Sequence, residues 1–194
     1  KLAAERVYHD WADDDERRSL VIVRPTVVFG PGGGGTGGRL LRHLAGPRFA
    51  HAGRAQNRKS LAFVENLAAF LAFVRSAPSR TQTLNYADVP ELPVAEIAAI
   101  VRSAVGLPPA PRYSMARAWA TNVREAIAAR LEGRPSASAR VANATIRRLA
   151  RDMRFNAAKA HQNGFRQPVA LREALAATAR ADVAWVAFLS RAKA

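Results

Sequence analysis

The stretch Leu20-Val-Ile-Val-Arg-Pro-Thr-Val-Val-Phe-Gly-Pro-Gly32 decides the fold of this chain. It starts as a nearly continuous run of β-branched and apolar residues, which is the pattern of a strand buried on both faces of a parallel sheet. The run stops at Gly30-Pro31-Gly32, so a loop follows the carboxyl end of the strand. Ligands of open α/β sheets bind at that end of the strands. We therefore expect a functional site around Arg24–Gly32.

A glycine-rich segment, Gly32–Gly38, follows the strand and allows a second interpretation. Gly30, Gly32 and Gly35 satisfy the spacing G-x-G-x-x-G between a strand and a helical pattern, as in dinucleotide-binding loops. However, Pro31 removes a backbone N–H from the turn, and no second strand with a ribose-binding acid follows about 20 residues later. We therefore interpret the segment as a flexible loop over a site.

The composition excludes several kinds of site. With 194 residues, the chain can form one domain with a real core or two small lobes. It contains no cysteine, which excludes disulfides and thiolate metal ligands. The four histidines lack partners at ligand spacing, so we expect no metal site. No signal peptide or membrane-length apolar run is visible, and we expect a cytoplasmic protein without a membrane partner.

Basic residues strongly exceed acidic ones, with 30 against 15 and a net charge of +15. Such an excess suits nucleic acid or a phosphorylated ligand. The arginines, however, are spread along the whole chain, and no basic strand rich in aromatic residues is found among them. We attribute the charge to biased residue usage and a missing acidic partner lobe, and we expect no nucleic-acid partner.

The pattern of expected elements is α/β first and helical afterwards. Strands are expected over 20–29, 59–64 and 82–88, and none later. Helices are expected over 1–11, 39–44, 65–75, 93–105, 114–131, 136–151 and 169–192. In the helix over 65–75, Leu67, Leu71 and Val74 form a core stripe. In the first helix, apolar side chains recur on one stripe at Ala3, Val7 and Trp11.

Five segments in order resemble the extended short-chain dehydrogenase/reductases, and among these the NAD-dependent epimerase/dehydratase family. They are Lys1–Glu5, Val23–Gly32, Lys59–Leu67, Leu84–Asp88, and Phe155–Lys159 with Asn163–Pro168 and Leu171–Leu175. The first is similar to the end of the family's Tyr-x-x-x-Lys signature and the residues after it, with Lys1 as the lysine of that signature. The second is similar to the family's Arg-Pro-x-x-Val-Tyr/Phe-Gly-Pro-Gly.

This resemblance implies an α/β fold, namely the remainder of a Rossmann-type parallel sheet with a mostly helical C-terminal substrate-binding lobe. Residues 1–30 and 59–88 would belong to the NAD-binding domain, whose N-terminal half is missing, and residues 31–58 and 89–194 to the substrate lobe. The chain starts at Lys1 without a methionine, so we expect it to be the back part of a longer protein and inactive alone. A homodimer is also implied.

The resemblance implies a catalytic and cofactor-binding role for Lys1. Its ammonium would lower the pKa of the signature tyrosine, four positions upstream, and would hold the nicotinamide ribose. Pro25, Thr26 and Val27 would contact the nicotinamide carboxamide through the backbone. Some members of the family carry asparagine where Val27 stands and use it to bind the sugar. The implied cofactor is NAD, and NADP is not excluded.

Three basic residues are candidates for binding the substrate diphosphate: Lys59, which corresponds to the family's basic residue at this position, and Arg39 and Arg154. Charge-assisted hydrogen bonds to two phosphates suit such side chains. The implied function is an epimerase or dehydratase that acts on a nucleotide-diphosphate sugar by tyrosine–lysine hydride chemistry. Two alternatives stay open. One is a keto-sugar reductase of the same family, and the other is a non-catalytic binding fragment without the catalytic half.

Overall fold

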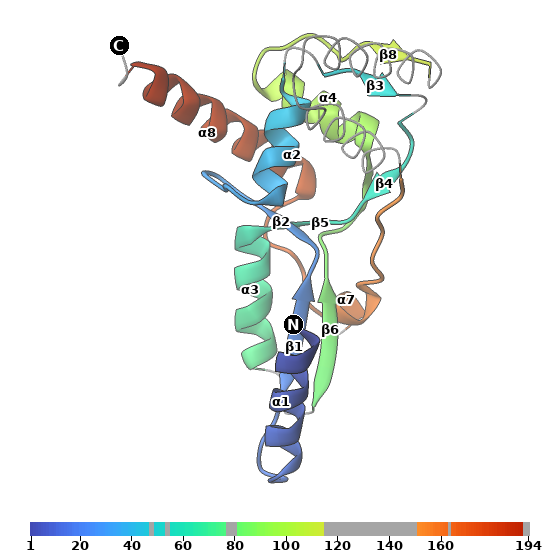
Figure 1. The fold of residues 1–194 in the computed structure, drawn as a ribbon, viewed down its shortest axis with the longest axis vertical. Helices are drawn as coiled ribbons and strands as arrows, with labels where there is room; N and C mark the ends of the chain where they lie inside the picture. Colours follow the sequence, from blue (N-terminus) through green and yellow to red (C-terminus); the bar gives the residue numbers. More distant parts are fainter. Residues whose placement is uncertain (47–48, 53–54, 77–80, 115–150, 163, 192–194) are drawn as a thin grey trace, which may run out of the picture.

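Short parallel strands and the helices around them make up the computed structural model, which describes residues 1–46, 49–52, 55–76, 81–114, 151–162 and 164–191 (Figure 1). The strands are β1 (Val21–Pro25), β2 (Val27–Phe29), β3 (His51–Ala52), β4 (Arg58–Lys59), β5 (Leu61–Phe63), β6 (Gln82–Tyr86), β7 (Leu92–Pro93) and β8 (Arg112–Tyr113). The helices are α1 (Leu2–Asp13), α2 (Thr36–Leu44), α3 (Val64–Arg75), α4 (Val94–Ala104), α7 (Ala158–Gln162) and α8 (Leu171–Arg191).

Two parallel strand pairs follow one another along the molecule. β1 pairs with β6, with Pro25 opposite Tyr86 at the carboxyl end, and β2 pairs with β5. The expected single strand over 20–29 is therefore two strands that change partner at Thr26. The Thr26 N–H still donates to the Tyr86 carbonyl at 3.0 Å, and the Asp88 N–H donates to the Leu61 carbonyl at 2.8 Å. This parallel arrangement confirms the α/β fold class.

Burial of the first strand is less complete than its apolar sequence predicts. Val21, Ile22 and Val23 are half-buried, and Arg24 and Pro25 are exposed. Aromatic side chains of α3 pack near one face of β1. The helix α1 runs along β1 (Figure 1) but brings little apolar surface to it, because only Ala12 in this helix is buried. The prediction that the strand is covered on both faces is thus wrong for the part of the chain described.

Two apolar clusters hold the elements together. One lies between α3 and the β1–β6 pair, where the ring of Phe70 stacks on Tyr86 with centroids 4.6 Å apart and Phe165 contacts both rings. The other joins α2, α4 and α8 through a set of aliphatic side chains, among them Leu41, Leu44, Ile97, Val101, Leu171 and Leu175. The first cluster supports the sheet, and the second builds the helical end seen at the top of Figure 1.

The predictions for later elements need two corrections. Strands do not stop at residue 88, because β7 pairs antiparallel with β4 and β8 pairs parallel with β3. In α3, Leu71 is 47% exposed, whereas Phe70 is fully buried. The stripe that faces the sheet therefore runs through Leu67, Phe70 and Val74, since α3 is apolar nearly all round and periodicity alone does not choose its inner face. The helices expected over 114–131 and 136–151 lie almost entirely outside the described residues.

We expect Phe70→Ala to destabilise the protein by about 3–5 kcal/mol, because it leaves a cavity in the cluster against the sheet. The matched variant Leu71→Ala, one position along the same helix, should cost about 1 kcal/mol or less, because this side chain is half exposed. Urea unfolding of the two variants measures the difference. Equal losses of unfolding free energy would contradict this assignment of the inner face.

Candidate functional site

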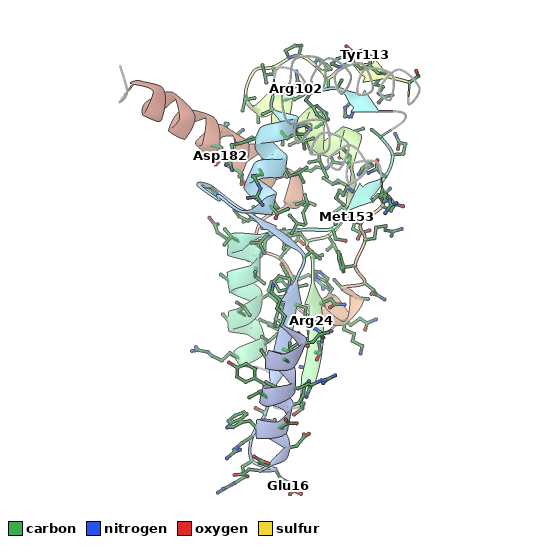
Figure 2. All side chains as sticks on the ribbon, viewed as in Figure 1. Glu16, Arg24, Arg102, Tyr113, Met153 and Asp182 are labelled. Carbon is green, nitrogen blue, oxygen red and sulfur yellow. The ribbon has the colours of Figure 1, made fainter. Side chains whose placement is uncertain are left out.

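An ion pair fixes the start of α1 beside the carboxyl end of β1. The Arg24 Nε donates to a Glu5 carboxylate oxygen at 3.0 Å, and Arg24 Nη2 contacts the second oxygen. The pKa of Glu5 is lowered by this guanidinium. The Glu5 N–H in turn donates to the Lys1 carbonyl at 3.0 Å. Lys1 is therefore one helical turn from Glu5, which binds Arg24 near the carboxyl end of β1. Figure 1 marks the N-terminus and Figure 2 labels Arg24.

The residues expected to bind a cofactor lie around this sheet edge. Lys1 is exposed and stands directly before the first residue of α1. Pro25 is exposed, while Val27 is half-buried and opens β2. Thr26 joins the two strands, and its hydroxyl is buried without a hydrogen-bond partner among the described residues. Pro25, Thr26 and Val27 thus lie at the carboxyl end of the β1–β6 pair, and Lys1 is one helical turn from Glu5, which binds Arg24 of the same strand.

A buried carboxylate lies beneath this edge. Both oxygens of Asp88 accept hydrogen bonds, one from the Phe63 N–H at 2.8 Å and one from the Tyr86 hydroxyl at 2.9 Å. Burial raises the pKa of Asp88 above its usual value, although both hydrogen bonds act in the opposite direction. Burial also raises the pKa of Tyr86. Asp88 therefore ties the end of β6 to the start of α3, a role that sequence reasoning did not assign although the Asn-Tyr-Ala-Asp segment contains it.

Lys59 and Arg154, two of the expected diphosphate-binding residues, come together where β4 meets the segment after residue 150. The Ser60 N–H donates to the Met153 carbonyl at 2.9 Å, and Met153 is labelled in Figure 2. Lys59 is buried, with a relative exposure of 6%, and its ammonium donates to the Arg151 carbonyl. Burial lowers the pKa of Lys59.

Glu91 binds Arg154 and the hydroxyl of Ser60, the residue after Lys59. The Arg154 Nε donates to a Glu91 oxygen at 2.6 Å, and the Ser60 hydroxyl donates to the other oxygen. Arg154 remains 60% exposed in its side chain. The third candidate, Arg39, lies on α2, and its guanidinium contacts the Thr36 hydroxyl at 3.4 Å within that helix. The structure therefore groups Lys59 with Arg154 and places Arg39 on a separate element.

The glycine-rich segment is tied down at two points. The Gly32 N–H donates to Asp182 of α8 at 3.1 Å, and Arg42 Nη1 contacts the same carboxylate at 3.3 Å and the Gly33 carbonyl at 3.2 Å. Figure 2 shows Asp182 next to α2. A Cβ at Gly37 would lie 2.2 Å from the Val28 carbonyl oxygen. Glycine here permits close packing of α2 on β2. The sequence signal for Asp182 was an acid in the middle of the last helix.

Two kinds of feature are not seen in the part of the chain that the structure describes. No group of histidine and acidic side chains there is arranged to hold a metal ion. Among the same residues, no helix combines the length and the apolar character needed to cross a bilayer.

One curated protein is similar to the chain over most of its length. It is the N-acetyl-alpha-D-glucosaminyl-diphospho-ditrans,octacis-undecaprenol 4-epimerase of Escherichia coli O157:H7, with 28% identity over 178 residues. The match covers 90% of the chain and 53% of that protein, so the chain spans about half the length of the curated relative it matches. No family model matches the chain.

Solved structures show the same fold. The Thermus thermophilus UDP-glucose 4-epimerase in complex with NAD matches with a TM-score of 0.56 and 17% identity, over 93% of this chain and 52% of that one. MoeE5 in complex with UDP-glucuronic acid and NAD matches with a TM-score of 0.58 and 20% identity, over 95% and 54%. The Pseudomonas aeruginosa protein RMD complexed with NADPH matches with a TM-score of 0.59 and 14% identity, over 94% of this chain and 53% of that one. The curated match confirms the resemblance to an epimerase, and the solved structures confirm the Rossmann-like fold.

We expect Asp88→Asn to lower the free energy of unfolding at pH 4 by about 1–3 kcal/mol. The asparagine amide has one oxygen and one N–H₂ group, so it can accept only one of the two hydrogen bonds that the Phe63 N–H and the Tyr86 hydroxyl donate to Asp88. This deficit should shrink as the pH rises. The pKa of Asp88 is raised on folding. Such a carboxyl contributes most to the free energy of unfolding at a pH below its pKa in the unfolded chain, and this contribution is lost as the pH rises through its pKa in the folded protein. Unfolding measured from pH 4 to 7 tests this.

The control for the pH series is Asp15→Asn. Arg17 lowers the pKa of this exposed carboxyl, so the wild type should gain stability over the variant as the pH rises, which is the opposite sign. If the two variants shift in the same direction, the assignment for Asp88 is wrong.

We expect Asp182→Ala to loosen the loop over residues 30–35, because it removes the acceptor of the Gly32 N–H and one partner of Arg42. Hydrogen exchange of a peptide spanning the loop should become at least about tenfold faster. The variant Glu173→Gln, at an exposed position earlier on α8, is the control. Unchanged protection in Asp182→Ala would show that the carboxylate does not hold the loop.

Proposed function

We propose that the full-length protein is an NAD-dependent epimerase or dehydratase that acts on a sugar carried on a diphosphate. The observation that supports the proposal is the Arg24–Glu5 ion pair, because it attaches the first turn of α1, which follows Lys1, to the strand that ends at Pro25. The edge lies at the carboxyl end of a parallel strand pair, which is where α/β sheets bind ligands. The resemblance of five segments supports the same reaction class.

The residues at this edge fit a nicotinamide cofactor. Lys1 offers an exposed ammonium, the strand junction offers backbone groups near exposed Pro25, and the Thr26 hydroxyl has no protein partner among the described residues. We propose that these residues hold the nicotinamide ribose and carboxamide. The bound cofactor would supply the reversible hydride transfer. NAD and NADPH both occur in the similar structures, so NADP stays an alternative.

Lys1 would act on a proton rather than on the hydride. Its positive charge beside a tyrosine hydroxyl favours the phenolate, which lowers the pKa of that tyrosine and makes it a base for a sugar hydroxyl at neutral pH. The resemblance puts this tyrosine four positions before Lys1. The helix α1 holds the lysine in place through the Glu5–Arg24 pair.

Lys59 and Arg154 would bind the diphosphate. Lys59 is held by the Arg151 carbonyl and Arg154 by Glu91, so both cations are oriented before any ligand binds. The curated relative is named for a polyprenol-diphosphate sugar, whereas solved neighbours are named for UDP-sugars. The two substrate classes share the sugar diphosphate, which is the part these residues would contact. Arg39, on α2, stays a weaker proposal for this role.

Three further proposals rest on the resemblance. We propose that residues 1–30 and 59–88 form part of the cofactor domain and residues 31–58 and 89–194 the substrate lobe. We propose a homodimer, supported by exposed apolar side chains on α1 at Leu2, Val7, Tyr8 and Trp11. A cytoplasmic location stays a prediction.

To test the proposal, the full-length protein should be assayed for NAD binding by calorimetry and for conversion of UDP-sugars, dTDP-sugars and a polyprenol-diphosphate N-acetylhexosamine. Epimerisation or dehydration would proceed without net consumption of NAD. Stoichiometric oxidation of NADH or NADPH would instead identify the keto-sugar reductase. If no dinucleotide binds, the enzyme assignment fails and the non-catalytic binding protein is favoured.

Lys1→Ala in the full-length protein should lower turnover at least about 100-fold, because the tyrosine loses the charge that favours its phenolate. Arg6→Ala removes the same charge from an exposed position five residues along α1, and should leave turnover within about twofold. The pH at which turnover is half-maximal should also rise in Lys1→Ala only. Equal effects of the two substitutions would refute the catalytic role of Lys1.

A further inference from the structure

The segment after residue 150 follows β4, beside the residues proposed to bind the diphosphate. The Met153 N–H donates to the Arg58 carbonyl at 3.1 Å, and the Ser60 N–H donates to the Met153 carbonyl at 2.9 Å. The Phe155 N–H then donates to the Ser60 hydroxyl at 2.9 Å. Met153 is the parallel bridge partner of Lys59, so the two residues lie directly beside each other. The backbone of the segment is therefore fixed along the strand that carries Lys59.

Two large apolar side chains of this segment are exposed to solvent. Met153 has an exposed fraction of 38% and Phe155 one of 49%. Arg154, which lies between them in the chain, is held by Glu91, and so is the Ser60 hydroxyl. Single exposed apolar residues are common on protein surfaces, but here two of them flank a cation that is proposed to bind a ligand. An apolar surface thus adjoins the proposed diphosphate site.

Polar groups next to Phe155 are already engaged within the chain. The side-chain oxygen of Asn156 accepts from the Ala158 N–H at 3.0 Å, and its backbone carbonyl accepts from the Asn85 amide at 3.3 Å. A nucleobase is a polar group whose donors and acceptors need partners when they leave water. An isoprenoid chain has neither donors nor acceptors, and it binds wherever apolar surface can be covered. This surface therefore suits an isoprenoid chain better than a nucleobase.

We propose that Met153 and Phe155 bind the apolar chain of a prenyl diphosphate, so that the substrate sugar is carried on a polyprenol rather than on a nucleoside. The inference rests on the proposed function and selects between the two substrate classes considered there. In such a substrate the sugar is attached to one phosphate and the chain to the other. A diphosphate held by Lys59 and Arg154 would therefore leave the chain free to lie over the neighbouring apolar surface, which Figure 2 marks at Met153.

Three probes without a sugar test this inference on the full-length protein, namely farnesyl diphosphate, UDP and inorganic diphosphate. In calorimetric titrations, farnesyl diphosphate is used below its critical micelle concentration. Its Kd should be at least about tenfold lower than that of inorganic diphosphate, and lower than that of UDP. A tenfold difference is about 1.4 kcal/mol, which about 60 Å² of newly buried apolar surface would supply.

The double variant Met153→Gln with Phe155→Gln removes the apolar surface and keeps both cations. It should raise the Kd of farnesyl diphosphate about tenfold and leave that of inorganic diphosphate within about twofold. Its thermal unfolding without ligand should match that of the wild type, because both side chains are largely in water. The control is Leu71→Gln, which replaces a side chain of similar exposure, 47%, on α3 and should change neither Kd.

Several results would overturn the inference. One is a farnesyl diphosphate that binds no tighter than inorganic diphosphate, and another is a double variant that binds it as the wild type does. A selective loss of UDP binding in the double variant would show a nucleobase on Phe155 instead. A lower unfolding temperature of this variant would show that the two side chains pack against another part of the full-length protein. The probes contain no dinucleotide, so a failure to bind NAD sinks the proposed function separately.

Discussion

The transfer of pairing from β1–β6 to β2–β5 is the constraint on which the rest of the structure depends. The Thr26 N–H makes the last bond to the Tyr86 carbonyl, and from Val27 onward the chain pairs with β5 instead of β6. Thr26 lies at the carboxyl end of the β1–β6 pair and the loop over residues 30–35 follows β2, and ligands of parallel sheets bind at such strand ends. β2 then pairs with β5, which directly follows β4 and Lys59 in the chain. The strand pair β2–β5 therefore connects the sheet edge to the expected diphosphate-binding region.

Ion pairs and buried carboxylates then position the elements around this junction. Arg24 holds α1 through Glu5, Asp88 holds the start of α3 through the Phe63 N–H, and Asp182 holds the glycine loop from α8. The three acids come from separate parts of the chain and all act close to a strand end or the loop after it. Asp88 and Asp182 are buried. A buried hydrogen-bonded carboxylate is costly to leave unpaired, so each of these two favours a single arrangement of the backbone it contacts.

The net charge of the chain does not show how its individual basic side chains are paired. The net charge of +15 suggested no particular surface from the sequence. In the structure, Arg24, Arg42 and Arg154 are all engaged by carboxylates, and Lys59 by a backbone carbonyl. For Lys59 and Arg154, which we propose as diphosphate-binding residues, such contacts would orient the cation before a ligand binds and so lower the entropic cost of binding.

The sequence by itself determined the α/β class and the order of most elements, because apolar runs, prolines and glycines act over a few residues. It did not determine the inner face of α3, since Phe70 and Leu71 are equally apolar. Only the tertiary structure decided that Glu5 meets Arg24, that Asp182 meets Gly32, and that Lys59 lies beside Arg154. Those contacts join residues far apart in the chain, and their partners are chosen by the packing of whole elements, which no local pattern of residues records.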